Sequence, residues 1–329
     1  MKCTSRKRKQ SLALGLSLLL LFSLTGCGSK EYSMEYDGDY AASAFRFESG
    51  DHGSRADSFA KDLCVGNEDV SVNSVNTSES EAALLCDLNN GEILYAKNIH
   101  KQLNPASLTK VLTAIVALKY GNLDDVLTAS ANVEIKESGA SLVGIKEGDT
   151  MTMSQALHAL LMPSGNDAAV MIAEHIGGSE EGFVEMMNEE AKALGATNSH
   201  FMNPHGLTAD DHYVTAYDMY LIFREAIRYD EFIQIITATE YTSIYHDRAG
   251  EPKELSFGSS NQFISGNHET PEGVVVVGGK TGTTNAAGNC LVLLSKDSKG
   301  NPYISVILKC SQRDYLYDTM YDLMSMEND

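Results

Sequence analysis

The chain has 329 residues, of which 43% are hydrophobic, and this is enough apolar sequence for one large domain or two small ones. Its formal net charge of −20 argues against a nucleic-acid partner, because binding a polyphosphate requires a basic surface that releases counterions. Basic residues form a block only within the first ten positions. The composition therefore predicts an acidic globular protein with a distinct N-terminal segment.

Residues 1–26 are typical of an export signal. Basic residues precede the apolar run SLALGLSLLLLFSL at 11–24, which is short for a membrane span. The segment closes with LTGC, Leu24–Cys27, which resembles the lipobox of bacterial lipoproteins, where the signal is cut before the cysteine and lipid is attached to it. We therefore expect a lipoprotein signal peptide over 1–26 and lipidation of Cys27, with a plain signal peptide as the alternative. Lipid would anchor an exported protein at the outer face of the cytoplasmic membrane without a spanning helix.

Residues 27–80 are rich in Ser, Gly, Asp and Glu and show no sustained apolar period. This composition predicts an acidic flexible tether, and a small ordered subdomain around 45–65 is the alternative. Four further cysteines stand in no metal-ligand spacing: Cys64, Cys86, Cys290 and Cys310. We expect them to be buried and free, and we expect neither a metal nor another cofactor.

The elements of one domain over 81–329 can be predicted in chain order. Two strand-like runs at 82–98 flank Asn90-Gly91, a strong hairpin signal. A helix that is apolar on nearly all sides begins close to Ser107 and continues to Gly121, so it should be buried. Helical patterns follow at 153–162, 166–178, 180–195 and 216–229. Strand-like runs return at 274–282, 289–297 and 302–310, and the last helix is expected at 314–326.

This order of elements predicts an α+β fold. Strands at both ends of the domain, with helices between them, imply a sheet that brings the two ends together. The helices would form an inserted subdomain at about 122–235.

Three short motifs occur in order along this domain. Ser107 and Lys110 form Ser-x-x-Lys at a helix start, a pattern that chance alone supplies roughly once in a chain of this length. Ser164-Gly165-Asn166 follows between two helices, and Lys280-Thr281-Gly282 lies at the end of an apolar strand. Each motif alone is weak, but the three in this order indicate a serine nucleophile activated by lysine.

The residue types suit acyl transfer. A serine hydroxyl such as that of Ser107 is a poor nucleophile until a base takes its proton. Lys110, on the same helix face, can be that base if burial or nearby positive charge discharges its ammonium. Lys280 would supply such a charge. Ser164 can relay a proton to the leaving group, and Asn166 can hold a substrate amide.

The remaining motif residues would bind the substrate. Lys280 and Thr281 offer a cation and a hydroxyl to a carboxylate, and Gly282 would let an edge strand approach the substrate backbone closely. An oxyanion hole requires two backbone N–H groups, and those of Ser107 and Thr283 are the candidates.

With these motifs, the segment from about 82 to 312 resembles the D-alanyl-D-alanine carboxypeptidases among the low-molecular-mass penicillin-binding proteins. The resemblance rests on PASLTK, PSGNDAA, NPHGL and KTGTT, which are close to the family's pattern. It implies the β-lactamase/transpeptidase-like fold, in which an antiparallel sheet is flanked by helices and the site lies at its junction with a helical subdomain. Many relatives also have a further β-rich domain and a membrane-bound C-terminal helix, in place of which we expect the lipid anchor.

The resemblance also implies a serine peptidase that removes the terminal D-Ala of peptidoglycan stem pentapeptides through an acyl-enzyme, with β-lactam antibiotics as inhibitors. Carried over to this chain, Ser107 would be the nucleophile and Lys110 the base. The second and third motifs of the family would be Ser164 with Asn166, and Lys280, Thr281 and Gly282.

Alternatives stay open. KTG is followed by TTNAAG where many of these carboxypeptidases have a bulkier residue, so endopeptidase action on cross-links is one. A β-lactamase would need an acidic residue to activate water, and a β-lactam sensor would bind antibiotic without peptide turnover. The histidines of HGLTADDH, at 205–212, fit no zinc spacing and are favoured as loop residues that satisfy backbone groups. Arg313 is favoured as a surface residue over a ligand for the substrate carboxylate.

Overall fold

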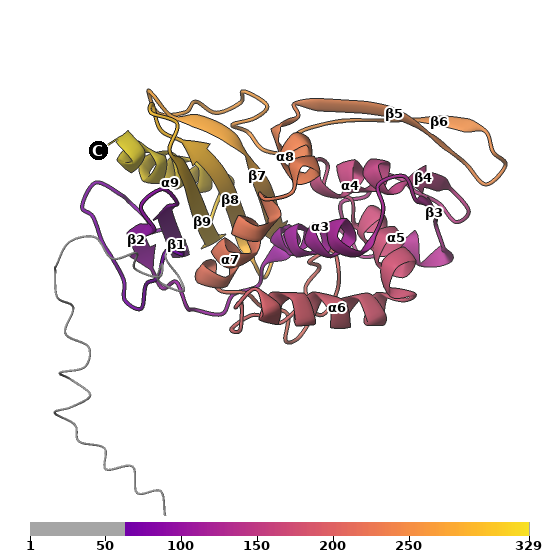
Figure 1. Cartoon of the computed structure of the whole chain (residues 1–329), viewed down its shortest axis with the longest axis horizontal. Coiled ribbons are helices and arrows are strands. Elements are labelled where there is room, and N and C mark those ends of the chain that lie inside the picture. Colours follow the sequence, from indigo (N-terminus) through magenta and orange to yellow (C-terminus); the bar gives the residue numbers. More distant parts are fainter. Residues whose placement is uncertain (1–62, 329) are drawn as a thin grey trace, which may run out of the picture. The chain divides into compact units, whose positions relative to one another are not determined.

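A five-stranded sheet joins the two ends of the domain in the computed structural model, which describes residues 63–328 (Figure 1). The expected signal peptide, Cys27 and residues 27–62 of the expected tether lie outside the described residues. The strand order is β2-β1-β9-β8-β7, and all neighbours are antiparallel. The strands are β1 (Ser80–Asp87), β2 (Glu92–Lys97), β7 (Val275–Thr284), β8 (Gly288–Lys296) and β9 (Pro302–Cys310).

The first and last strands pair directly. β1 lies beside β9 with Ser80 opposite Cys310, so the ends of the domain meet in one sheet as the order of elements predicts. β1 and β2 form the predicted hairpin, and Gly91 has a φ of +69° at its turn, where a side chain would strain the backbone. These pairings confirm the predicted α+β fold.

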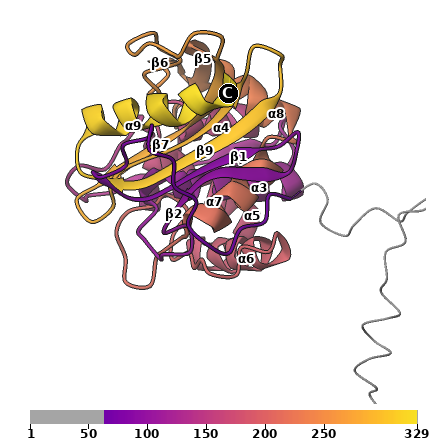
Figure 2. The same ribbon diagram turned by 90° about the vertical axis from the view of Figure 1, so that its left-hand side faces the viewer.

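Helices cover both faces of the sheet. α9 (Arg313–Ser325) lies across one face, as Figure 2 shows, while α3 (Thr109–Tyr120) and α7 (Ala216–Ala226) pack on the other. Leu84 and Leu85 point to opposite faces of β1, and both are fully buried. Burial on both faces explains why the strands of this sheet read as nearly continuous apolar runs.

The region from 122 to 235 is mainly helical. It contains α4 (Met153–Leu161), α5 (Asn166–Gly177), α6 (Glu180–Ala193), α7 and α8 (Asp230–Thr237). It also contains two short strands, which join a long hairpin in a second sheet of order β3-β4-β5-β6 (Figure 1). These strands are β3 (Val126–Thr128), β4 (Thr150–Thr152), β5 (Glu240–His246) and β6 (Pro252–Gly258). The sequence does not predict these strands, because most of their residues are at least partly exposed and the apolar alternation is weak.

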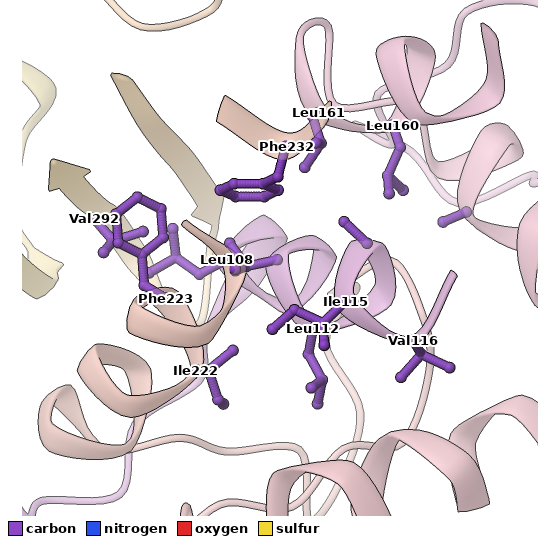
Figure 3. Packing of buried hydrophobic residues seen from close by; sticks show 14 of the residues in the cluster. Leu108, Leu112, Ile115, Val116, Leu160, Leu161, Ile222, Phe223, Phe232 and Val292 are labelled. Carbon is purple, nitrogen blue, oxygen red and sulfur yellow. The ribbon is translucent and has the colours of Figure 1, made fainter. Parts of the chain in front are cut away.

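The helix α3 is buried on nearly all sides, as its sequence predicts. The one-turn 3₁₀ helix η1 (Ala106–Leu108) leads into it. Figure 3 shows apolar side chains of α4, α7, α8 and β8 gathered around it: Leu160, Leu161, Ile222, Phe223, Phe232 and Val292. Burying each side chain of this size contributes about 1.5–3 kcal/mol. This packing carries Lys110, in the first turn of α3, into the interior with an exposed fraction of 0%.

Residues 63–79 pack on the domain, so the expectation that a flexible tether extends to residue 80 is wrong for this stretch. Cys64 is fully buried, and its N–H donates to the Tyr220 hydroxyl at 3.0 Å. Val70 pairs with a residue of β2, and the Thr77 hydroxyl lies 2.7 Å from that of Tyr95. The segment is held through single residues rather than through a helix or strand face, and for this reason its sequence shows no period.

The four cysteines of the described residues are free and buried, as expected: Cys64, Cys86, Cys290 and Cys310. Among the helices within 63–328, none combines the length and the apolar character needed to span a membrane.

Candidate active site

Ser107 and Lys110 meet at the start of the central helix. The Lys110 Nζ donates to the Ser107 Oγ at 2.9 Å, to the Asn166 Oδ1 at 2.6 Å and to the backbone carbonyl of His205 at 2.7 Å. The three-residue spacing across the junction of η1 and α3 places the serine and the lysine on one face. A hydroxyl and an amine are therefore in direct hydrogen-bond contact.

Ser164 and Lys280 form a second pair. Ser164 lies in the short loop between α4 and α5 with a left-handed φ of +67°, a conformation that is uncommon outside glycine and is concentrated at functional sites. The Lys280 Nζ, from the interior of β7, donates to the Ser164 Oγ at 3.0 Å and to the Thr281 carbonyl at 2.8 Å. The loop thus presents the serine hydroxyl to the lysine.

Both lysines are fully buried, and burial changes their protonation. Burial lowers the pKa of Lys280 to about 7. Burial also holds the pKa of Lys110 well below its ordinary value, the charge of Lys280 lowers it further, and Asp167 opposes both effects. Burial and the charge of Lys280 both favour the neutral amine of Lys110, which is the form that can accept a proton from a hydroxyl.

Two glycines let other backbone segments pack against the turn that carries Ser107. A Cβ on Gly282 would lie 2.9 Å from the Ser107 backbone nitrogen and 3.1 Å from that of Leu108. A Cβ on Gly206, whose φ is +88°, would lie 1.9 Å from the Ala106 carbonyl oxygen. The close approach that the structure shows at Gly282 is therefore to η1, whereas the expected approach to a substrate backbone stays a prediction.

A cleft of about 450 Å³ opens at Ser107. Asn166 lines it from α5, Thr283 and Thr284 line it from β7, and the loops at 137–141 and 205–208 supply further lining residues. Among the strands within residues 63–328, β8 alone pairs with β7, so β7 is an edge strand of this sheet. An extended peptide in this cleft could therefore add to the sheet along β7.

Thr281 has a hydroxyl neighbour that no sequence motif marks. The Thr281 Oγ1 lies 3.1 Å from the Oγ of Ser260, which follows β6 after one intervening residue. Two hydroxyls and the adjacent ammonium of Lys280 are groups that bind a carboxylate well.

Asp167 is a second residue of the site that no sequence motif marks. Its buried carboxylate accepts hydrogen bonds from the backbone N–H groups of residues 143–145 at 2.8–3.2 Å. The Asn166 N–H donates to the Ser141 carbonyl at 2.8 Å. These bonds hold one wall of the cleft against the start of α5. In the sequence, an acidic residue in a first helical turn indicates only a helix start.

The loop histidines contact backbone and hydroxyl groups. The Leu207 N–H donates to the His205 Nδ1 at 3.2 Å, and the His212 Nε2 lies 3.0 Å from the Thr109 hydroxyl. Burial lowers the pKa of His205 to about 3 and that of His212 to about 4. Within the part of the chain that the structure describes, no group of three or more His, Cys, Asp or Glu side chains is arranged to hold a metal ion. Arg313 is exposed and does not line the cleft.

Motifs that lie more than 170 residues apart in the sequence thus come together at one site. Comparison with known proteins identifies the family. A family model described as D-alanyl-D-alanine carboxypeptidase matches residues 69–312. The chain belongs to this family. The match confirms the family and the transpeptidase-like fold that the motifs predict.

Individual members of the D-alanyl-D-alanine carboxypeptidase family show the extent of the similarity. The carboxypeptidase DacF of Bacillus subtilis (strain 168) is 36% identical over 231 residues, which cover 68% of this chain and 55% of that protein. DacB2 of Mycobacterium tuberculosis (strain ATCC 25618 / H37Rv) is 35% identical over 211 residues, which cover 64% of this chain and 68% of that protein. The chain spans about half the length of several curated relatives that it matches.

A solved structure shows the same fold. The Streptomyces K15 DD-transpeptidase matches with a TM-score of 0.70 and 25% identity, over 76% of this chain and 97% of that one.

Proposed function

We propose that this protein is a serine-type D-Ala-D-Ala carboxypeptidase that removes the terminal D-Ala from peptidoglycan stem pentapeptides. The observation that carries the proposal is the contact between the Ser107 hydroxyl and the buried amine of Lys110, beside the second buried lysine, Lys280. Membership in the D-alanyl-D-alanine carboxypeptidase family supports the substrate class.

Acylation would begin when Lys110 is neutral, so that its Nζ accepts the hydrogen bond of the Ser107 hydroxyl instead of donating to it, and then takes the proton. The Ser107 Oγ then attacks the carbonyl carbon of the penultimate D-Ala. The resulting oxyanion would be bound by the backbone N–H groups of Ser107 and Thr283, whose residues both line the cleft. One such donor is typically worth about 10²–10³-fold in rate.

The leaving D-Ala needs a proton and a place for its carboxylate. Ser164 would donate the proton to the departing amine and recover one from Lys280, to which it is hydrogen bonded. The hydroxyls of Thr281 and Ser260, together with the charge of Lys280, would bind the terminal carboxylate. Asn166 has its Oδ1 on Lys110, so its Nδ2 would donate to an amide carbonyl of the substrate.

Water would then hydrolyse the acyl-enzyme. A β-lactamase needs a carboxylate held in place to activate that water, whereas Glu137, the acidic residue among those that line the cleft, is exposed. We therefore expect β-lactams to acylate Ser107 and the resulting acyl-enzyme to be hydrolysed slowly, so that these antibiotics act as inhibitors.

The cellular setting rests on the N-terminal sequence. We propose that the protein is exported, cleaved after residue 26, and anchored to the outer face of the cytoplasmic membrane by lipid on Cys27, with residues 27–62 as the tether. Growth with a labelled fatty acid should label the wild-type protein and not a Cys27→Ser variant. A labelled Cys27→Ser protein would contradict the anchor.

The enzyme proposal is tested by mass spectrometry of muropeptides incubated with residues 28–329. The mixture should contain pentapeptides and cross-linked dimers. We expect release of one D-Ala from the pentapeptide, loss of this product in Ser107→Ala, and full activity in Ser298→Ala, a control in an exposed turn of the sheet.

Other outcomes of the same assays would select another function. Cleavage of the dimers would indicate an endopeptidase, and rapid multiple-turnover hydrolysis of a cephalosporin would indicate a β-lactamase. A stable penicilloyl adduct without any peptide product would indicate a β-lactam sensor.

A further inference from the structure

A second cavity, of about 560 Å³, lies at the end of the five-stranded sheet. We call it the sheet-end cavity. The ends of β1, β2 and β9 and the turn between β7 and β8 form it, and its lining includes Lys97, Ser311 and Lys309. Asn285, in the turn after β7, lines both this cavity and the cleft at Ser107. The two hollows are therefore neighbours on one surface.

Lys309 reaches the cavity through a bulge in β9. Ile307 lies in the core beneath α9 and Leu308 lies in the core beside α3, so regular alternation would place Lys309 beneath α9. Cys310 occupies the α9 side instead, and the register of β8 against β9 shifts at this point. Lys309 takes a left-handed φ of +53°, which typically costs about 1–3 kcal/mol. Bulges beside active sites re-aim side chains in this way.

Other charged side chains of the cavity have close partners. The Lys97 Nζ donates to two backbone carbonyls at 2.6 Å each. Glu81 pairs with Lys101 at 2.5 Å, and Glu79 accepts a hydrogen bond from a serine hydroxyl at 2.6 Å. Lys309 is exposed, and within residues 63–328 no carboxylate forms an ion pair with it. The pKa of Glu81, which lines the same cavity, is lowered mainly by Lys101 and to a smaller extent by Lys309. The Lys309 ammonium thus has no ion-pair partner among these residues and can bind an anionic ligand.

The proposed function fixes the direction of a bound peptide. The amine of the leaving D-Ala must contact Ser164, and the carboxylate of the same D-Ala must contact Thr281. The acyl side of the substrate therefore points along β7 toward Thr284. A substrate strand on this edge runs antiparallel to β7. An extended chain advances about 3.3 Å per residue, so with the acylated D-Ala opposite Thr283, the residue before it lies opposite Thr284. The carbonyl group that joins the next residue upstream then reaches Asn285, and the α-carbon of a residue linked through its side chain lies further along, toward the sheet-end cavity.

We infer that the sheet-end cavity is a subsite for the upstream part of the stem peptide, and that the Lys309 ammonium binds the free carboxylate there. The second residue of a stem peptide is D-glutamate, which is joined to the third through its side-chain carboxyl. Its α-carboxylate therefore remains free and anionic. This subsite rests on the proposed function and deepens it, because it makes the enzyme sensitive to the carboxylate two residues before the acylated D-Ala.

The test compares three substrates on Lys309→Met protein. They are a pentapeptide with the free D-glutamate carboxylate, the same pentapeptide with a carboxamide there, and a diacetyl-lysyl-D-Ala-D-Ala tripeptide. We expect kcat/KM to fall about fivefold for the first substrate alone, the size of one partly exposed ion pair. Lys309→Arg should retain the wild-type preference, and Lys299→Met, in an exposed turn, should change nothing.

Two outcomes would overturn the subsite. An equal loss on all three substrates would show that Lys309 acts only through the fold, and an unchanged kcat/KM would show that the bulge merely keeps a lysine out of the core. If wild-type protein released D-Ala from none of the three, the proposed function would fail. The subsite would then be judged by calorimetry on Ser107→Ala protein, where equal affinities for the carboxylate and carboxamide pentapeptides would reject it.

Discussion

Replacing Gly282 with alanine should move the turn that carries Ser107. The added Cβ would lie 2.9 Å from the Ser107 nitrogen and 3.1 Å from both the Leu108 nitrogen and the Ala106 Cβ, whereas ordinary contact begins at 3.4 Å. The contacts are with backbone or with a Cβ, so no flexible side chain can yield. η1 must therefore move away from β7 by about half an ångström.

A displacement of this size acts on the chemistry more than on the fold. A misplacement of 1 Å costs about 10²-fold in rate, so half of that predicts an acylation rate about tenfold lower. Overpacking costs about 1–3 kcal/mol, which lowers the melting temperature of a domain of this size by several degrees. The rate of acylation by a fluorescent penicillin and the thermal unfolding curve measure the two effects on the same sample.

Gly258 provides the matched control for this substitution. A Cβ at Gly258, at the end of β6, would meet only the Thr239 carbonyl oxygen at 3.5 Å, which is an ordinary contact. Gly258→Ala should therefore acylate at the wild-type rate. The reasoning would be refuted if Gly282→Ala also acylated at the wild-type rate, or if both variants slowed equally.

Three further predictions concern stability. Burial raises the pKa of Glu327 to about 8, so stability falls as pH rises from about 4.5 through 8. In urea unfolding, Glu327→Gln should match wild type at pH 4 and exceed it by roughly 4–5 kcal/mol at pH 9. A chain that starts at residue 80 should melt roughly 5–10 °C below one that starts at residue 63, because it lacks the buried side chains of residues 63–79. Equal melting temperatures in calorimetry would mean that these contacts contribute nothing to stability. Lys280→Met should raise the free energy of unfolding at pH 7 by about 2 kcal/mol, and the variant should no longer be acylated. A destabilised variant would show that the hydrogen bonds of this lysine outweigh the cost of desolvating it.

The motif residues of the site could be predicted because the chemistry restricts them. A lysine one turn after a serine, and a second lysine later in the chain, are residue types that a lysine-activated serine requires. Ser260 and Asp167 could not be found in this way. A serine or an aspartate at these positions has no fixed spacing to the motifs, and only the folded chain brings Ser260 to the Thr281 hydroxyl.

The fold shows the same division. Strands buried on both faces, such as β8 and β9, were predicted within one or two residues of their ends because their apolar runs are long. The hairpin of β5 and β6 was missed. Tyr241 and Tyr245 lie on one face of β5 and are at least partly buried, but most other residues of the two strands are exposed, so the apolar alternation is too weak to indicate a strand. Residues 63–79 were misread as tether, because anchors such as Cys64 are single and leave no pattern.

The two buried lysines are the strongest physical argument that the site exists for chemistry. A pKa lowered from 10.5 to about 7 means that Lys280 gives up roughly 4 kcal/mol of stability at pH 7, since the native state binds its proton less tightly than the unfolded chain does. Folding alone would favour an apolar residue of similar volume at that place. In the proposed function this cost has a use. An amine with a pKa near 7 is hydrogen bonded to Ser164, and its charged form adds to burial in lowering the pKa of Lys110 beside Ser107. The stability that Lys280 gives up is therefore better explained by the proposed acyl transfer than by any contribution to the fold.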